Sequence, residues 1–219
     1  MSKQLSIFSN NYQTKIYPSN SSKVKGERIP LKNSEITLYR KFFTDDQSKN
    51  LFLELQEKIA WKQETIKLYG KTMPIPRLTA WYGDSDKTYV YSGITLQPLN
   101  WIKPLILIKN KIECFSPVKF NSVLLNLYRN GNDSVAWHSD DEPELGKKPI
   151  IGSVSLGGSR RFMFKSKDKN NPESYAIELT NGSFLLMAGD TQKYWLHQIP
   201  KTKKAVTPRI NLTFRVIYS

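Results

Sequence analysis

From about residue 120 to its C-terminal end, the chain is a series of short β-rich runs separated by Gly, Asn, Pro and Asp. This pattern constrains the fold most, because it predicts strands over residues 123–129, 151–156, 162–165, 175–179, 183–187 and 209–218. Before residue 120, apolar residues instead recur at helical spacing in two segments. A capping box of Thr44 and Gln47 starts a helix over about residues 45–60, and a second helix begins near Pro104. We therefore expect an α+β protein with a double-stranded β-helix (jelly roll) core and N-terminal helices packed on one sheet.

The domain organisation follows from length and charge. With 219 residues, of which 39% are hydrophobic, the chain can build one well-buried core, and we place this domain at residues 34–219. Residues 1–33 are polar and hold six Lys/Arg against one acid, which predicts a flexible basic N-terminal arm.

The single cysteine, Cys114, has no partner for a disulfide or a CxxC site, which favours a reducing intracellular compartment. Cys114 itself is interpreted as a small apolar filler. Since the start lacks a signal-peptide pattern and no long apolar stretch occurs, we expect a soluble monomer without a membrane partner. It would lie in the cytoplasm of a prokaryote, or in the nucleus, cytoplasm or both of a eukaryote.

The formal net charge of +14 has two interpretations. A polyanionic partner such as nucleic acid is one, because phosphate contacts by Lys and Arg release counterions. A lysine-rich solubilising surface is the other. The N-terminal arm carries only part of the excess charge, so the folded part is basic as well.

The last predicted strand alternates completely between apolar and polar residues. Its polar face holds Arg209, Asn211, Thr213 and Arg215. Such a row of donors suits a dicarboxylate, because Arg binds carboxylate bidentately. The same alternation also occurs in a strand whose polar face is simply exposed to solvent.

Only two histidines occur, His138 and His197. His138 and Asp140 are two residues apart, so an extended backbone directs both to one side, where they can take two facial positions on a metal. A hydrogen-bonded structural histidine is the alternative. Similarly, Asn126 and Tyr128 share a strand face and are either binding groups or satisfied core polar groups.

Together these segments resemble the AlkB family of iron(II)- and 2-oxoglutarate-dependent dioxygenases, in the branch that repairs alkylated nucleic acids. The resemblance extends from about residue 75 to the C-terminus, and the motif sequences resemble most those of the animal AlkB homologues two and three. It rests on the motifs IPR at 75–77, WYGD at 81–84, TYVYSG at 88–93, NLYRNG at 126–131, WHSDDEP at 137–143, SVSLGG at 153–158 and PRINLTFR at 208–215.

The resemblance implies a ligand set and a cosubstrate site. Fe(II) would be bound by His138, Asp140 and His197. Arg209 would pair with the distal carboxylate of 2-oxoglutarate, assisted by Tyr128. The remaining wall of the cosubstrate site would comprise Asn126 and Arg215 at the iron-chelating end, with Asn211 and Thr213. The implied chemistry uses O2, converts 2-oxoglutarate to succinate and CO2, and hydroxylates an N-alkyl group that departs as an aldehyde.

The implied substrate is an N-alkylated base, such as 1-methyladenine or 3-methylcytosine, in DNA, with RNA as a further candidate. The base must be flipped or unpaired to be reached. Tyr89 and Tyr91 match the family's base-contacting segment, against a cross-strand aromatic pair as alternative. Glu142 matches the position that faces the base and would favour a cationic one, whereas Asp141 and Glu144 are interpreted as a solvated turn.

Further basic and aromatic residues are candidates for nucleic-acid contact. Tyr69 stands where a relative inserts a finger into the duplex, although a turn-capping Tyr explains it equally well. Candidates for phosphate contact are Arg77, Arg160, Arg161, Lys165 and Lys167, each of which can also be an ordinary surface charge.

Two other functions remain compatible with these motifs. A 2-oxoglutarate dioxygenase can act on a methylated protein or a small molecule, because fold does not dictate substrate. A nucleic-acid-binding module without turnover is the second alternative, against which the complete set of iron and cosubstrate residues argues.

Overall fold

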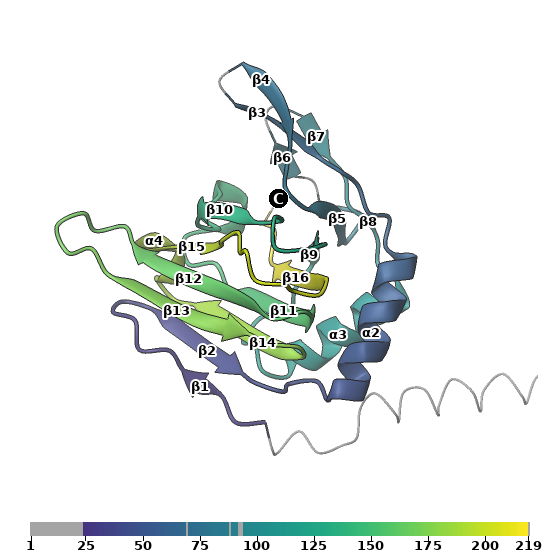
Figure 1. The fold of residues 1–219 in the computed structure, drawn as a ribbon, viewed down its shortest axis with the longest axis horizontal. Coiled ribbons are helices and arrows are strands. Elements are labelled where there is room, and N and C mark those ends of the chain that lie inside the picture. Colours follow the sequence, from purple (N-terminus) through teal and green to yellow (C-terminus); the bar gives the residue numbers. More distant parts are fainter. Residues whose placement is uncertain (1–23, 69, 88, 92–93, 219) are drawn as a thin grey trace, which may run out of the picture.

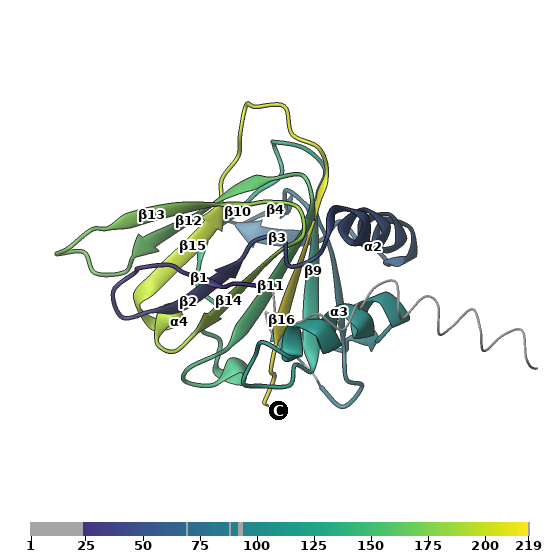
Figure 2. The same cartoon turned by 90° about the horizontal axis from the view of Figure 1, so that it is seen from below.

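The computed structural model describes residues 24–68, 70–87, 89–91 and 94–218. Two mainly antiparallel sheets lie face to face, and two helices cover the outer face of the larger sheet (Figure 1, Figure 2). The predicted α+β jelly roll with helices on one sheet is therefore confirmed.

The larger sheet has eight strands within the described residues, in the order β1-β2-β14-β11-β16-β9-β5-β8. Their bounds are β1 Glu27–Arg28, β2 Glu35–Tyr39, β5 Leu78–Gly83, β8 Leu99–Asn100, β9 Ser122–Tyr128, β11 Ile151–Gly157, β14 Ser183–Ala188 and β16 Arg209–Arg215. Among the strands of the described residues, only β5 and β8 pair in parallel. Strand β16 lies in the middle of this sheet, and both of its faces are covered, one by the helices and the other by the second sheet (Figure 2).

The smaller sheet has the order β10-β15-β12-β13. Its strands are β10 Val135–His138, β12 Arg160–Ser166, β13 Ser174–Leu179 and β15 Trp195–Ile199. The short helix α4 Thr191–Tyr194 leads into β15, and a 3-10 helix, Pro143–Leu145, follows β10. Two hairpins, β3 Thr65–Leu68 with β4 Lys71–Pro74 and β6 Tyr89–Tyr91 with β7 Ile94–Leu96, extend beyond the two sheets (Figure 1).

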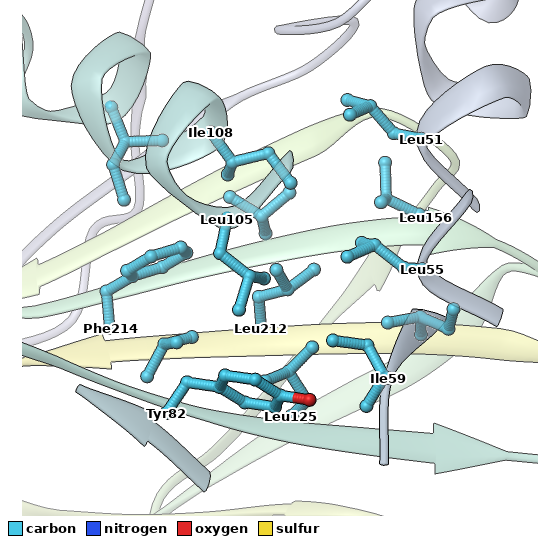
Figure 3. Close-up of a cluster of buried hydrophobic side chains, with 14 of the residues drawn as sticks. Leu51, Leu55, Ile59, Tyr82, Leu105, Ile108, Leu125, Leu156, Leu212 and Phe214 are labelled. Atoms are coloured by element: carbon cyan, nitrogen blue, oxygen red, sulfur yellow. The ribbon is translucent and has the colours of Figure 1, made fainter. Parts of the chain in front are cut away.

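Both predicted helices are present. In α2, Asp45–Lys58, the Thr44 hydroxyl accepts from the Gln47 amide and the Gln47 side chain accepts from the Thr44 amide, so the capping box is formed. Helix α3, Lys103–Glu113, has Pro104 in its first turn. Apolar side chains of both helices pack on β16 and its neighbours (Figure 3).

A second apolar cluster lies between the two sheets. It joins residues of β2, β11 and β14 to Phe162, Phe164, Trp195 and Ile199 of the smaller sheet. The protein thus has two buried layers, one on each side of the larger sheet: a helix layer and an inter-sheet layer.

Two predictions differ from the structure. Ile29 and Leu31 are buried in the inter-sheet layer, so folded structure begins before the boundary predicted after residue 33. Their apolar side chains, not the surrounding charge, decide their location. Cys114 is exposed at the C-terminal end of α3 and is not an apolar filler. Residues 1–23 of the predicted arm lie outside the described residues.

Across the described ranges, no helix combines the length and apolar character that crossing a bilayer requires.

Candidate active site

The polar face of β16 is buried, so its interpretation as a solvent-exposed face is wrong. Arg209 is 1% exposed, Asn211 8% and Thr213 9%, because the smaller sheet covers this side of the strand. On β9, Tyr128 is the register partner of Arg209, and Asn126 is the partner of Asn211. Strand pairing thus aligns polar groups of two strands across one face of the larger sheet.

These groups border a cavity of about 60 Å³ between the sheets. Its lining comprises Arg77, Leu124, Asn126, Tyr128, Val135, His138, Asp140, Ser153, Phe162, Met187, His197, Ile199, Arg209, Asn211, Thr213 and Arg215. All nine residues predicted to bind metal or cosubstrate are among them.

The opposite wall of the cavity carries the predicted metal ligands. His138 ends β10 and pairs with His197 on β15, and Asp140 follows in the loop after β10. One ligand atom from each residue lies within 4.8 Å of the others, so the group can hold one metal ion. Nδ1 of His138 lies 2.8 Å from the Ala136 carbonyl oxygen, which suits an Nδ1–H tautomer with Nε2 available for a metal.

Charges around the cluster favour the metal-binding protonation states. Burial would raise the pKa of Asp140, but Arg215, which donates to its Oδ1 at 2.5 Å, and the two imidazoles lower it below the usual value. Burial lowers the pKa of His197 to about 3. Asp140 is therefore ionised and His197 neutral at neutral pH, as metal ligation requires.

Arg209 supplies a cation at the other end of the cavity. Its Nη2 donates to Ser155 Oγ at 2.8 Å, while its Nε and Nη1 are buried and have no hydrogen-bond partner within the described residues. Burial lowers the pKa of Arg209 to about 10, so the guanidinium is still charged at neutral pH. A buried cation with two unused donors is costly without a ligand, and a carboxylate fits both donors.

Comparison with known proteins identifies the family. A model of the 2OG-Fe(II) oxygenase superfamily matches residues 35–215. Alpha-ketoglutarate-dependent dioxygenase alkB homolog 3 of Bos taurus is 43% identical over 193 residues, covering 84% of this chain and 67% of that protein. Human DNA oxidative demethylase ALKBH2 is 36% identical over 188 residues, covering 82% and 72%. The solved structure of OsALKBH1 has the same fold, with a TM-score of 0.60 at 18% identity, over 88% of this chain and 100% of that one.

This chain belongs to the AlkB family of 2OG-Fe(II) dioxygenases. Its cofactors are Fe(II), 2-oxoglutarate and O2. The cavity of this AlkB protein fits Fe(II) and 2-oxoglutarate. The neutral imidazole of His197 and the ionised carboxylate of Asp140 lie at one end, where they suit a metal, and the buried cation of Arg209, with two donors unused among the described residues, lies at the other, where it suits a carboxylate.

The predicted substrate residues of the AlkB chain lie in several places. Glu142 is half-buried just before the 3-10 helix, and its Oε2 is buried without a partner in the described residues. Arg77 lies in the cavity wall, where its Nε donates to Asn126 Oδ1 at 2.7 Å and its Nη1 to the Ser134 carbonyl at 3.0 Å.

The predicted aromatic contacts remain predictions. Tyr89 and Tyr91 form β6, which pairs with β7, but their side chains are outside the described part. Tyr69 lies outside the described residues altogether.

Two phosphate-contact candidates of the AlkB chain have other partners. Arg160 is 3% exposed and donates to the carbonyl oxygens of Asn130, Asp133 and Pro200, so its interpretation as a phosphate contact is wrong. Lys167 donates hydrogen bonds to Ser139 Oγ, Asp141 Oδ2 and the Gln192 carbonyl oxygen, beside the metal cluster. In contrast, Arg161 and Lys165 are exposed on β12.

Sequence reasoning missed several supporting residues. Ser153 and Ser155 on β11 contact Asn211 and Arg209, and their spacing in SVSLGG is the strand signal that places them on one face. Phe162 stacks on His197 with ring centroids 5.3 Å apart. Gln192 accepts a bond from the Asp140 amide, and no sequence pattern marks that contact.

Proposed function

We propose that this dioxygenase oxidatively removes alkyl groups from N-alkylated bases of nucleic acid, of the 1-methyladenine and 3-methylcytosine type. The observation that carries the proposal is the cavity in which a His-Asp-His cluster faces the Arg209 guanidinium, whose Nε and Nη1 have no hydrogen-bond partner within the described residues. A relative named DNA oxidative demethylase, 36% identical to this chain, supports the choice of nucleic acid over a protein or small molecule.

His138, Asp140 and His197 are proposed as the Fe(II) ligands. When bound, Fe(II), 2-oxoglutarate and O2 would supply the oxidation: one oxygen atom would convert 2-oxoglutarate to succinate and CO2, and the other would hydroxylate the alkyl carbon, which then leaves the base nitrogen as an aldehyde. The surrounding protein keeps two of these ligands in the protonation state that metal binding requires. Arg215 keeps Asp140 ionised, and burial keeps His197 neutral.

Arg209 is proposed to bind the distal carboxylate of 2-oxoglutarate through its unused Nε and Nη1. Its neighbour Tyr128 lies beside this guanidinium, with the guanidinium carbon 5.2 Å from the ring centre. Asn126, Asn211, Thr213 and Arg215 are the proposed remaining wall of the cosubstrate site, since all four line the same cavity.

Glu142 is proposed to face the flipped base. Glu142 follows Asp140 by two residues, and its buried Oε2 has no hydrogen-bond partner in the part of the chain that the structure describes. A carboxylate there stabilises a base made cationic by alkylation more than a neutral base. Tyr89, Tyr91, Tyr69 and Arg77 are further proposed substrate residues.

We propose DNA, RNA or both as the nucleic-acid partner. The net charge of +14 suits both DNA and RNA, because counterion release depends on phosphates and not on the sugar. We propose that the enzyme acts as an intracellular monomer.

The test is release of formaldehyde from matched oligonucleotides that carry 1-methyladenine, 3-methylcytosine or no lesion, each as single-stranded DNA, duplex DNA and RNA. With Fe(II), ascorbate and 2-oxoglutarate, the methylated strands are expected to release formaldehyde, and Asp140→Ala is expected to abolish release. Asp46→Ala, which removes an exposed carboxylate from α2, is the control that retains it. The proposal fails if alkylated DNA and RNA stay unchanged while metal and 2-oxoglutarate are bound.

Base selection is tested separately with Glu142→Gln. We expect kcat/KM for 1-methyladenine to fall roughly 10- to 150-fold, because one charge-assisted contact is worth roughly 1.5–3 kcal/mol. The control is Glu144→Gln, two residues further along the chain. Equal losses in both variants would contradict the assignment of Glu142.

A further inference from the structure

The segment that carries Asp140 has little regular structure of its own. Strand β10 ends at His138, and the residues that follow lie in a loop before the 3-10 helix. Asp140 is nevertheless 2% exposed. Contacts from other elements must therefore set its position relative to His197, whose Nε2 is 3.8 Å from Asp140 Oδ2.

Gln192 provides one such contact. It belongs to α4, is 1% exposed, and its Oε1 accepts from the Asp140 backbone amide at 3.0 Å. Its Nε2 lies 3.8 Å from Met187 Sδ, which orients the amide. Since α4 leads directly into β15, this bond joins the Asp140 loop to the element that carries His197.

Lys167 provides the second contact. Its Nζ donates to Ser139 Oγ at 2.7 Å, to the Gln192 carbonyl at 2.8 Å and to Asp141 Oδ2 at 2.9 Å. A lysine ammonium has three donors, so all of them are used. Ser139 lies between the two ligand-bearing residues, and its hydroxyl in turn donates to Asp141 Oδ2 at 2.8 Å.

The backbone fixes Lys167 to the strand of His197. The Lys167 amide donates to the Tyr194 carbonyl at 2.9 Å, directly beyond the β12–β15 ladder in which Phe164 is the partner of His197. A side chain anchored in this way can hold the loop at a set distance from β15.

We infer that Lys167 and Gln192 are positioning residues that hold the Asp140 loop against His197 and so preorganise the metal site. The inference rests on the proposed assignment of His138, Asp140 and His197 to iron. Residues that orient metal ligands by hydrogen bonds, without binding the metal themselves, typically contribute about 10- to 100-fold to metal affinity. Lys167 is thereby assigned to the metal site and not to a phosphate.

The experiment compares Lys167→Met with Lys169→Met in the full chain. Lys169 is exposed two residues further on, so its replacement removes the same charge but none of these bonds. Mn(II) serves as the metal probe, and its Kd is measured by electron paramagnetic resonance below the unfolding transition of every variant. We expect Kd to rise 10- to 100-fold in Lys167→Met and to stay near the wild-type value in Lys169→Met.

Two further readouts separate positioning from other roles. Lys167→Arg retains donors and is expected to recover most of the Mn(II) affinity. Affinity for unmodified single-stranded DNA should be equal in the two methionine variants. Unchanged Mn(II) affinity in Lys167→Met would overturn the inference, as would loss of DNA affinity alone. The iron assignment itself is tested by His138→Ala: if this variant binds Mn(II) as tightly as wild type does, the proposed function fails first.

Discussion

The two buried layers on either side of the larger sheet differ in chemistry although they share strand β16. In the helix layer, Leu212 and Phe214 pack against apolar side chains of α2 and α3. In the inter-sheet layer, Arg209 and Asn211 of the same strand line a polar cavity. Alternate residues of one strand therefore serve stability on one face and chemistry on the other.

The difference lies in how polar groups are satisfied. Apolar residues in the helix layer need only close packing. Two donors of Arg209 in the inter-sheet layer have no partner within the described part of the chain. Burying donors without an acceptor lowers the stability of the ligand-free protein, and a ligand that supplies the acceptor stabilises the folded state.

The largest expected effect is that of Arg209→Met, which should lower the affinity for 2-oxoglutarate without lowering stability. Arg209→Met should weaken 2-oxoglutarate binding by about 2–5 kcal/mol, or roughly 30- to 4,000-fold in Kd, because it removes one partner of a buried charge pair. Without 2-oxoglutarate, the variant should unfold at the same or a higher denaturant concentration, because a buried charge with two unused donors among the described residues is gone. Calorimetric titration and denaturation measure the two effects. Arg40→Met, an exposed control, should change neither, and a destabilised apo variant would contradict this account.

A substitution on the opposite face of β16 should have the opposite pattern of effects, lowering stability without changing the affinity for 2-oxoglutarate. Leu212 is 0% exposed, and Leu212→Ala should lower the free energy of unfolding by about 3 kcal/mol through lost burial and cavity formation. Because its side chain faces the helices, the folded variant should bind 2-oxoglutarate with unchanged Kd. The control is Leu53→Ala at an exposed leucine of α2, expected to cost less than about 0.5 kcal/mol. A large rise in the Kd of folded Leu212→Ala would show that the two faces are coupled.

Local patterns were sufficient to predict the helix layer. Thr44 and Gln47 marked the start of α2, and alternation from Arg209 onward assigned each side chain of β16 to a face. Both signals depend on neighbours in the chain, because capping and strand alternation are local geometries.

The inter-sheet layer could be predicted only in part, because its environment arises from long-range pairing. Alternation did not reveal that the Arg209 face is covered, since the covering strands β10 and β15 are short and were not predicted. Arg160 was predicted to be a phosphate contact or an ordinary surface charge, yet it is buried against three carbonyl groups. The contacts of Lys167 likewise join segments far apart in the sequence. The family resemblance supplied the ligand residues that such patterns alone left open.

A smaller effect tests the helix layer at its edge. Thr44→Ala should lower the free energy of unfolding by about 1 kcal/mol, because the Gln47 amide loses its acceptor at the helix start. Chemical denaturation of folded protein measures this loss. Thr44→Ser keeps the hydroxyl and should recover most of it, whereas equal losses in both variants would mean that methyl packing and not the cap is responsible.

The smallest effect concerns Lys111, a half-buried cation whose ammonium, unlike Nε and Nη1 of Arg209, has a hydrogen-bond partner among the described residues. Its Nζ donates to the Phe42 carbonyl at 2.8 Å and lies 4.2 Å from the Phe43 ring centre, and burial lowers its pKa from 10.5 to about 8. Between about pH 8 and 10.5 the unfolded chain binds a proton that the folded protein lacks, so the free energy of unfolding should rise with pH across this window. Partial exposure limits the rise to well under about 1 kcal/mol per pH unit. Denaturation at several pH values should show this rise in wild type but not in Lys111→Met. An equal slope in both proteins would mean that the cation of the helix layer is no more perturbed than a surface lysine.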